Sequence, residues 1–131
     1  MLFRSIELDA TFAPAYINRS AARMHAGDLP GALADAELAC GLRSTSWAAA
    51  LARGLALEAG GRCEESRAAL DRVVELAPAR MEGYYYRARV RHRLGDVTGA
   101  LSDLEHLLLI APKDWPLRAK VEEDVEKLRQ K

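Results

Sequence analysis

The chain has few cysteines, few aromatic residues and no excess of charge of either sign. Of its 131 residues only two are cysteine and only 6% are aromatic, and the 19 basic side chains are balanced by 19 acidic ones. Two cysteines, Cys40 and Cys63, provide neither a disulfide framework nor the four ligands of a structural zinc site. A formal net charge of zero gives no overall attraction to nucleic acid or to an anionic membrane.

Long apolar runs are also lacking. No uncharged run approaches the ~20 residues that cross a bilayer, and residues 1–5 lack the apolar segment of a secretory signal. The sequence therefore predicts no membrane segment and favours a reducing, cytoplasmic location. What is present, 50% apolar and 29% charged residues, is typical of a folded protein, and 131 residues suit one domain.

One spacing recurs along the chain. Gly27, Gly61 and Gly95 lie 34 residues apart, and other positions follow the same period. Apolar residues within each unit have helical spacing, and no stretch alternates as a half-buried strand would. Each glycine is suited to end one helix, and Asp28 and Asp96 are suited to cap the start of the next. The period predicts three helical hairpins.

The helix boundaries follow from these signals. Proline is tolerated in the first turn of a helix, where its missing N–H has no partner to lose. Pro14, Pro30 and Pro116 are accordingly assigned to first turns. The expected helices span 14–26, 29–42, 47–60, 63–76, 81–94, 97–110 and 115–130.

A 34-residue helix–turn–helix unit with small residues at fixed positions resembles the tetratricopeptide repeat (TPR). The resemblance is carried best by residues 81–114, which include Gly95 to Leu101 and a terminal Pro112. It implies a single all-α domain over residues 1–131, folded as a right-handed α-solenoid. The expected parts are the end of a partial repeat (1–12), three repeats (13–46, 47–80 and 81–114) and a capping helix (115–131).

The two ends differ. Residues 1–8 match the end of a second helix, since Leu8 precedes Leu42 by 34 residues. Two interpretations follow: the chain is a piece of a longer protein, or residues 1–8 pack on a second copy and form a homo-oligomer. At the other end, an amphipathic helix has an apolar stripe of Leu117, Val121, Val125 and Leu128. Its charged residues are expected to face away: Arg118, Glu122, Glu123, Asp124, Lys127 and Arg129.

Stacked hairpins curve, so the first helix of each pair is expected to line a concave groove. Groove positions that differ between units are candidates for ligand contact. The sequence predicts that the groove is apolar along the first two units and polar, aromatic and basic in the third. The candidate peptide-binding residues are Asn18, Met24, Leu51, Leu55, Tyr85, Tyr86, Arg89, His92 and Arg93.

These side chains suit an extended or helical peptide with apolar side chains. An acidic group of that peptide is expected near Arg89 and Arg93, because arginine pairs with carboxylates through two hydrogen bonds. Three other arginines, Arg19, Arg53 and Arg87, recur at the 34-residue period. Repetition in every unit indicates a structural role, an ion pair within each hairpin with residues such as Asp35 and Asp103.

The sequence predicts a non-enzymatic interaction module or assembly scaffold. No cofactor or metal site follows from it, since no nucleophile has a positioned base and His25, His92 and His106 are expected to be surface or half-buried residues. The resemblance leaves two chaperone alternatives. Binding of heat-shock chaperone tails would rest on Asn18 alone, because Ala48 and Ala52 replace the family's basic residues. Secretion-type chaperones for apolar client segments have a similar size.

Nucleic acid is a further alternative. Tyr84, Tyr85 and Tyr86 with the nearby arginines would form a weak RNA-binding surface on the third repeat. The sequence does not favour this function, because alternate arginines on a helix point in different directions and the rest of the groove has no basic track. The arginines concerned are Arg80, Arg87, Arg89, Arg91 and Arg93.

Overall fold

The computed structural model describes residues 12–130, and within them every regular element is a helix. The half-hairpin and the oligomer contact that the sequence assigns to residues 1–8 lie outside the described residues. The helices are α2 (Ala13–His25), α3 (Leu29–Leu42), α4 (Trp47–Ala59), α5 (Cys63–Leu76), α6 (Met81–Arg93), α7 (Val97–Ile110) and α8 (Arg118–Arg129).

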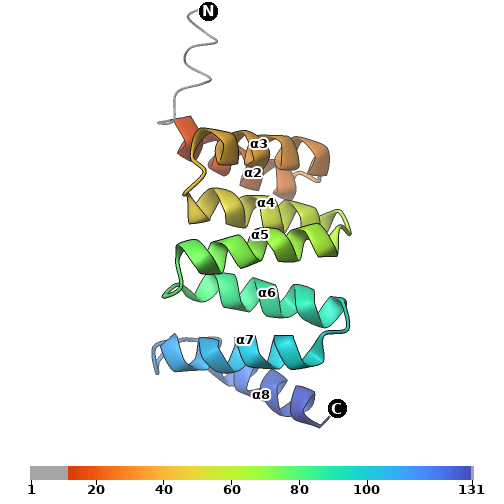
Figure 1. Ribbon diagram of the computed structural model, residues 1–131, viewed down its shortest axis with the longest axis vertical. Coiled ribbons are helices and arrows are strands. Elements are labelled where there is room, and N and C mark those ends of the chain that lie inside the picture. The colour runs from red at the N-terminus through yellow and green to blue at the C-terminus, as the bar shows by residue number, and fades with distance from the viewer. Residues whose placement is uncertain (1–11, 131) are drawn as a thin grey trace, which may run out of the picture.

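The hairpins stack in chain order along one axis, with α2 and α3 at one end and α8 at the other (Figure 1). Three antiparallel pairs, α2–α3, α4–α5 and α6–α7, are the hairpins, and α8 packs on α7. The first helices also contact each other, α2 with α4 and α4 with α6. The predicted all-α solenoid is confirmed. None of the helices in residues 12–130 is both long and apolar enough to span a membrane.

The turns within the hairpins form as expected. Gly27, Gly61 and Gly95 have φ angles of 84°, 80° and 86°, in the left-handed region that a side chain disfavours. Asp28 and Asp96 each accept a hydrogen bond from the backbone N–H three residues later, at 3.0 and 2.9 Å. These caps fix where the second helix of the first and third hairpins begins.

Small residues allow the two helices of each hairpin to approach closely. In the first hairpin the Ser20 hydroxyl donates to the Ala32 carbonyl at 2.8 Å. In the second, the Ser66 hydroxyl donates to the Gly54 carbonyl at 2.7 Å, so the hydroxyl comes from the other helix. Each hydroxyl is fully buried and would be costly without its partner.

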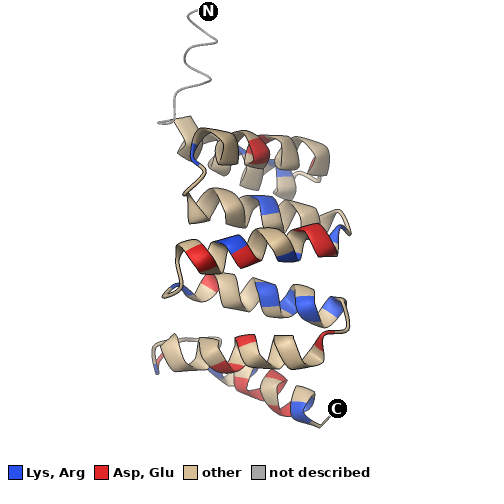
Figure 2. Cartoon of the chain, viewed as in Figure 1, with Lys and Arg blue, Asp and Glu red and all other residues tan. Residues whose placement is uncertain are grey.

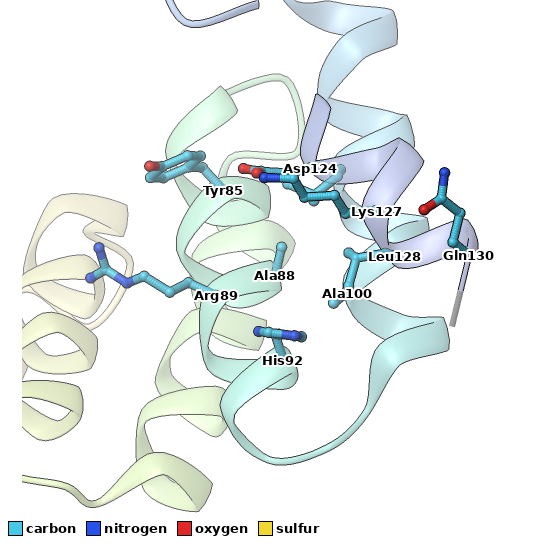
Figure 3. Close-up of a pocket in the computed structure, with 10 residues that line it drawn as sticks. Tyr85, Ala88, Arg89, His92, Ala100, Asp124, Lys127, Leu128 and Gln130 are labelled. Carbon is cyan, nitrogen blue, oxygen red and sulfur yellow. The ribbon is translucent and has the colours of Figure 1, made fainter. Parts of the chain in front are cut away.

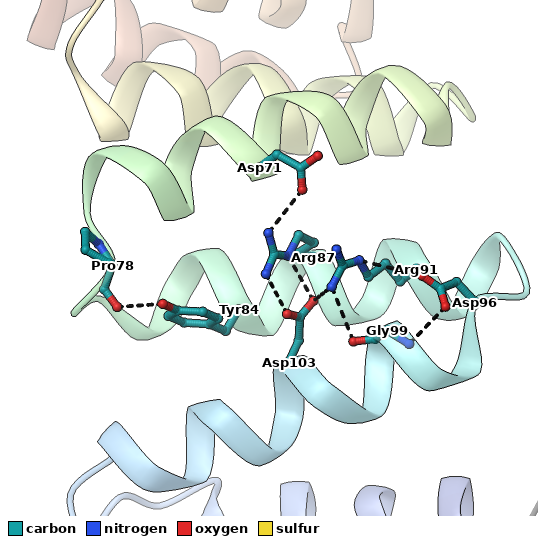
Figure 4. A network of polar contacts seen from close by, with 8 residues as sticks. All are labelled: Asp71, Pro78, Tyr84, Arg87, Arg91, Asp96, Gly99 and Asp103. Atoms are coloured by element: carbon teal, nitrogen blue, oxygen red, sulfur yellow. Dashed lines mark hydrogen bonds and ion pairs between the residues drawn. The ribbon is translucent and has the colours of Figure 1, made fainter.

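The recurring arginines form the predicted ion pairs in two hairpins. Arg19 donates to Asp35 through two hydrogen bonds of 2.8 Å. Arg87 contacts Asp103 at 2.7 and 3.0 Å, and it also reaches Asp71 on the preceding hairpin at 3.1 Å (Figure 4). The prediction is wrong for Arg53, which has no ion pair with any described residue.

The capping helix starts later than predicted. It begins at Arg118, so Pro116 precedes the helix instead of lying in its first turn. Leu117 is the N-cap and is 47% exposed, which removes it from the predicted apolar stripe. The rest of the stripe is buried against the third hairpin: Val121, Val125 and Leu128 pack on Tyr84, Leu104 and Leu107.

Arg118 does not face away from the stack as the sequence predicted. Its guanidinium donates to the carbonyls of Leu108 and Ala111 at 2.9 and 2.7 Å. These carbonyls lie at the C-terminal end of α7, where they lack partners within the helix and where the helix dipole favours a cation. Arg118 therefore caps α7 and fastens α8 to it.

Candidate functional site

A cavity of 670 Å³ lies between α6, α7 and α8. Its floor is apolar and formed by side chains that are buried in the third hairpin and the capping helix. Its rim is polar, with groups from α6 on one side and from α8 on the other (Figure 3). The floor is Ala88, Ala100, Leu104 and Leu128, and the rim is Tyr85, Arg89, His92, Asp124, Lys127 and Gln130.

The helical period explains the α6 side of this cavity. Tyr85, Arg89 and His92 are separated by four and three residues, so they lie on one face of α6. Ala88 on the same side is too small to fill the space in front of it. Across the cavity, α8 is held away from α6 by its packing on α7, which leaves the hollow open.

Three of the nine candidate residues line this cavity: Tyr85, Arg89 and His92. The other six lie elsewhere. Leu51 and Tyr86 pack against the cluster between α4, α5 and α6. Met24 and Leu55 are half-buried, Asn18 and Arg93 are exposed, and none of these four lines the cavity.

The two arginines assigned to an acidic ligand group already hold a carboxylate of this chain. Glu58 on α4 is only 5% exposed; Arg89 donates to it at 2.9 Å and Arg93 at 3.3 Å. The hydrogen bonds that Arg89 donates to Glu58 raise the pKa of the Arg89 guanidinium, against the opposing effect of burial. The side chains of Arg89 and Arg93 keep 47% and 50% of their surface exposed.

Sequence reasoning missed this role of Glu58, although a signal was present. Arg89 and Arg93 follow Glu58 by 31 and 35 residues. His92 is the position one 34-residue period after Glu58, and Arg89 and Arg93 lie three residues before it and one residue after it, so they belong to the same turns of the neighbouring first helix. The signal in the sequence was Glu58 itself, a single acidic residue among the apolar groove positions of the second unit.

The contribution of α8 was also missed. Asp124 and Lys127 were expected to face solvent, but both line the cavity, and Asp124 is half-buried. They lie three residues apart and so are neighbours on the surface of α8, beside the buried Val125. No sequence pattern gives the distance between a capping helix and the hairpin before it, so their place on the rim could not be deduced.

No protein-family model matches the sequence, and no curated protein sequence matches it. Solved structures match its shape. The first TPR of Spaghetti (RPAP3), bound to the HSP90 peptide SRMEEVD, is 16% identical with a TM-score of 0.84, covering 93% of this chain and 94% of that one. The chain has the TPR fold.

Two further TPR-like structures agree. The type III secretion translocator chaperone SycD of Yersinia enterocolitica is 17% identical with a TM-score of 0.83, covering 89% of this chain and 83% of that one. The TPR2B domain of yeast Sti1, in complex with pHsp70, is 15% identical with a TM-score of 0.84, covering 92% and 98%. At these identities the similarity establishes the fold.

The basic side chains of this TPR stack gather along α6 (Figure 2). Each arginine of the RNA-binding alternative has an acidic partner among the described residues. Arg80 pairs with Glu82, and the others pair with the carboxylates described above or with the α7 N-cap. The remaining pairs are Arg87 with Asp71 and Asp103, Arg91 with Asp96 and Asp103, and both Arg89 and Arg93 with Glu58.

The histidines lie at the surface, as expected. His25, His92 and His106 are all exposed, and the His106 ring packs against the Tyr84 ring at a tilt of 41°, with the ring centroids 4.4 Å apart. Within residues 12–130, no three His, Cys, Asp or Glu side chains are grouped so that they could hold a metal ion.

Proposed function

We propose that the chain is a non-enzymatic protein-interaction module that binds a peptide segment along α2, α4 and α6, with an apolar side chain in the cavity between α6 and α8. The cavity itself is the observation that carries this proposal. Its 670 Å³ lies within the range of ~300–1,000 Å³ that is usual for ligand pockets. The solved TPR neighbours, which are interaction domains, support the same class of function.

The chemistry of the cavity suits one apolar anchor residue. Buried Leu104, Leu128 and two alanines give it an apolar floor, and removing an aliphatic or aromatic side chain from water there stabilises the complex by about 25 cal/mol per Å². A peptide also carries backbone N–H and C=O groups, which need partners at the rim. Tyr85, Lys127 and Gln130 supply hydroxyl, ammonium and amide groups for them.

We also propose that an acidic group of the peptide lies beside Arg89 and Arg93. Two guanidiniums share the single carboxylate of Glu58, which leaves one unit of positive charge and half of each arginine side chain exposed. A ligand carboxylate would share these donors with Glu58. The Glu58→Gln variant should therefore bind an acidic peptide more tightly, and a neutral version of that peptide no more tightly than the native chain does.

A second candidate is a secretion-type chaperone for apolar client segments. The observation that favours it is the similarity to SycD, which has also been solved in complex with a peptide of the translocator YopD. A client chaperone accepts many apolar segments, whereas a dedicated module prefers one motif. The peptides that the chain selects distinguish the two: unrelated apolar sequences indicate a chaperone, and one motif indicates a dedicated module.

A heat-shock chaperone tail peptide serves as a negative control for this proposal. RPAP3 was solved with SRMEEVD, but this chain shares only Asn18 with the residues that the resemblance assigns to such binding. Ala48 and Ala52, at the positions of the basic residues, have no charge to offer and are half-buried on α4. We expect no binding of SRMEEVD at micromolar concentration.

The test is a selection of displayed random peptides on the full chain, followed by fluorescence polarisation with the selected sequence. His92→Trp places a bulky ring at the exposed rim and should weaken binding by about tenfold or more. His25→Trp makes the same change at an exposed histidine of α2, outside the cavity, and should bind as the native chain does. Equal affinity of both variants would refute the cavity as the binding site.

Two finer proposals rest on the sequence alone. We propose a cytoplasmic location, and a homo-oligomer formed through residues 1–8. Light scattering with size-exclusion chromatography of the full chain, beside a version that starts at Ala10, tests the second. A full-length dimer and a truncated monomer would support it; two monomers would refute it.

A further inference from the structure

Arg53 breaks the ion-pair pattern of the stack. Arg19 and Arg87 each donate two hydrogen bonds to the aspartate 16 residues later. The residue 16 positions after Arg53 is Ala69, which has no polar side chain. The half-buried Arg53 guanidinium therefore lacks the carboxylate that its counterparts hold, and no described residue forms an ion pair with it.

A cavity of 380 Å³ lies where that carboxylate is missing. It is open to solvent and is lined by α3, α4 and α5 and by the turn between the first two of these helices. Arg53 and Ala69 both line it, and so do Arg72, Ser44 and Ser46. In the third hairpin the equivalent space is filled by Asp103, bonded to Arg87 and Arg91 (Figure 4).

We propose that this cavity binds an acidic side chain, aspartate or glutamate, of a partner protein. The partner's carboxylate would take the position that Asp103 occupies beside Arg87, and accept two hydrogen bonds from the Arg53 guanidinium. Such paired, charge-assisted bonds are the geometry for which arginine is best suited. The partner protein would supply the carboxylate at this site, whereas the first and third hairpins supply their own, Asp35 and Asp103.

The groups around Arg53 suit a carboxylate. The Arg72 guanidinium donates to the Ser44 carbonyl at 3.5 Å and lies 3.8 Å from the Glu75 carboxylate, and both contacts are long and exposed enough to rearrange. The Ser46 hydroxyl accepts a bond from the Ala49 N–H, so its own proton is available to a ligand oxygen.

Two side chains that can carry a negative charge, Cys40 and Glu37, also line the cavity. Burial raises the pKa of the Cys40 thiol, which keeps it uncharged at neutral pH. Glu37 carries the one acidic side chain in the lining, and it is exposed and forms no ion pair with Arg53. The two lining arginines outnumber Glu37. Glu75 offsets part of the Arg72 charge from outside the lining. Glu65 interacts with Arg53 without forming an ion pair, so the attraction to an anion rests on Arg53.

This cavity is separate from the peptide groove. Arg53 is two residues from both Leu51 and Leu55, and residues two apart on a helix point to nearly opposite sides. A partner bound at Arg53 would leave the α6–α8 cavity free. The inference does not depend on the proposed function.

The experiment measures the Arg53 side-chain Nε–H resonance of the full chain by NMR. One probe is a blocked pentapeptide with a central aspartate between glycines; the others are its asparagine counterpart and inorganic phosphate. The aspartate peptide should shift the resonance in a saturable way, and the asparagine peptide should not. No shift with the aspartate peptide, or a shift with phosphate alone, would overturn the proposal, the latter by indicating a small-anion site.

Variants provide the second readout. Ala69→Asp restores the internal pair, so it should raise the melting temperature above that of Ala69→Asn and abolish the shift caused by the peptide. A melting temperature no higher than that of Ala69→Asn would overturn the proposed geometry.

Charge-matched arginine variants test the contact itself. Arg53→Gln should weaken peptide binding by about tenfold or more, followed through the backbone amides around Ala69. Arg67→Gln removes the same charge from α5 outside the cavity, where Arg67 pairs with Glu64, and should bind as the native chain does. Equal weakening by both variants would indicate nonspecific attraction and refute the proposal.

Discussion

Buried carboxylates in this stack each hold two arginines that lie four residues apart on one helix. Asp35, Glu58 and Asp103 are at most 5% exposed, and each has two guanidinium partners. A carboxylate without a partner at such depth would be strongly disfavoured, whereas one with two cations and several hydrogen bonds is satisfied. The pairs are Arg19 and Arg23 on Asp35, Arg89 and Arg93 on Glu58, and Arg87 and Arg91 on Asp103.

Removing one of these carboxylates should be costly because it leaves two cations partly buried. We expect Asp103→Ala to lower the free energy of unfolding by about 3–5 kcal/mol, measured by urea denaturation. Asp71→Ala removes the other partner of Arg87, but Asp71 is 45% exposed, and its loss should cost less than about 1 kcal/mol. Equal losses in the two variants would contradict this assignment.

The pairing of Asp35 also predicts a dependence on pH. The hydrogen bond from Arg19 lowers the pKa of the Asp35 carboxyl despite its burial. The unfolded chain therefore binds a proton at a higher pH than the folded chain, and the stabilisation is complete only above the unfolded value of about 4. We expect stability to fall as the pH drops below 4, and Asp35→Asn, followed by urea denaturation at several pH values, to show a smaller fall. An unchanged pH profile would rule out this role.

At the scale of elements, α8 illustrates what can be predicted from a sequence. The amphipathic stripe correctly gave Val121, Val125 and Leu128 as buried residues, because helical periodicity fixes which side chains share a face, but it was wrong for Leu117, which precedes the helix. The predicted start of α8 was wrong, because the first turn of a helix is only one of the places where proline is tolerated. The chain instead turns before the helix, with the Trp115 N–H bonded to the Pro112 carbonyl at 3.1 Å and the Arg118 N–H to the Trp115 carbonyl at 3.0 Å.

The same contrast holds for the candidate site. Helical spacing placed Tyr85, Arg89 and His92 together, since it is a property of one helix. It could not reveal Glu58 or Lys127 as their neighbours, because those contacts depend on how α4 and α8 pack around α6. Periodicity gives the faces of each element, and tertiary packing decides which faces meet.

Arg118 should govern how firmly α8 is attached. Its hydrogen bonds to carbonyls at the end of α7 are charge-assisted and worth about 1.5–3 kcal/mol. We expect Arg118→Gln to speed amide hydrogen exchange throughout α8 while leaving α4 and α5 unchanged. Lys120→Gln is the control, because the one ion pair that Lys120 forms with the described residues lies within α8, with Asp124 at 2.9 Å. Equal acceleration in both variants would show that general loss of charge is responsible.

On the scale of the whole molecule, the stack is a linear array of hairpins in which contacts form between neighbours. The middle hairpin contacts the hairpins before and after it, and α2 and α3 have no substantial contact with α6, α7 or α8. In such a chain the stability is approximately the sum of the stabilities of the repeats and of the interfaces between neighbours. Cooperativity therefore depends on the α3–α4 and α5–α6 interfaces, and local damage should have local consequences.

Amide hydrogen exchange of two variants tests this view. Asp35→Ala should reduce protection most in α2 and α3, less in α4 and α5, and least in α6 to α8, because only neighbouring contacts transmit the loss. Asp103→Ala should give the opposite gradient, with the largest loss of protection in α6 and α7. This second variant controls for the possibility that one end of the stack has low protection in any variant. A uniform loss over residues 12–130 in both variants would contradict the description as a linear array, because it would mean that the three hairpins unfold as a single unit.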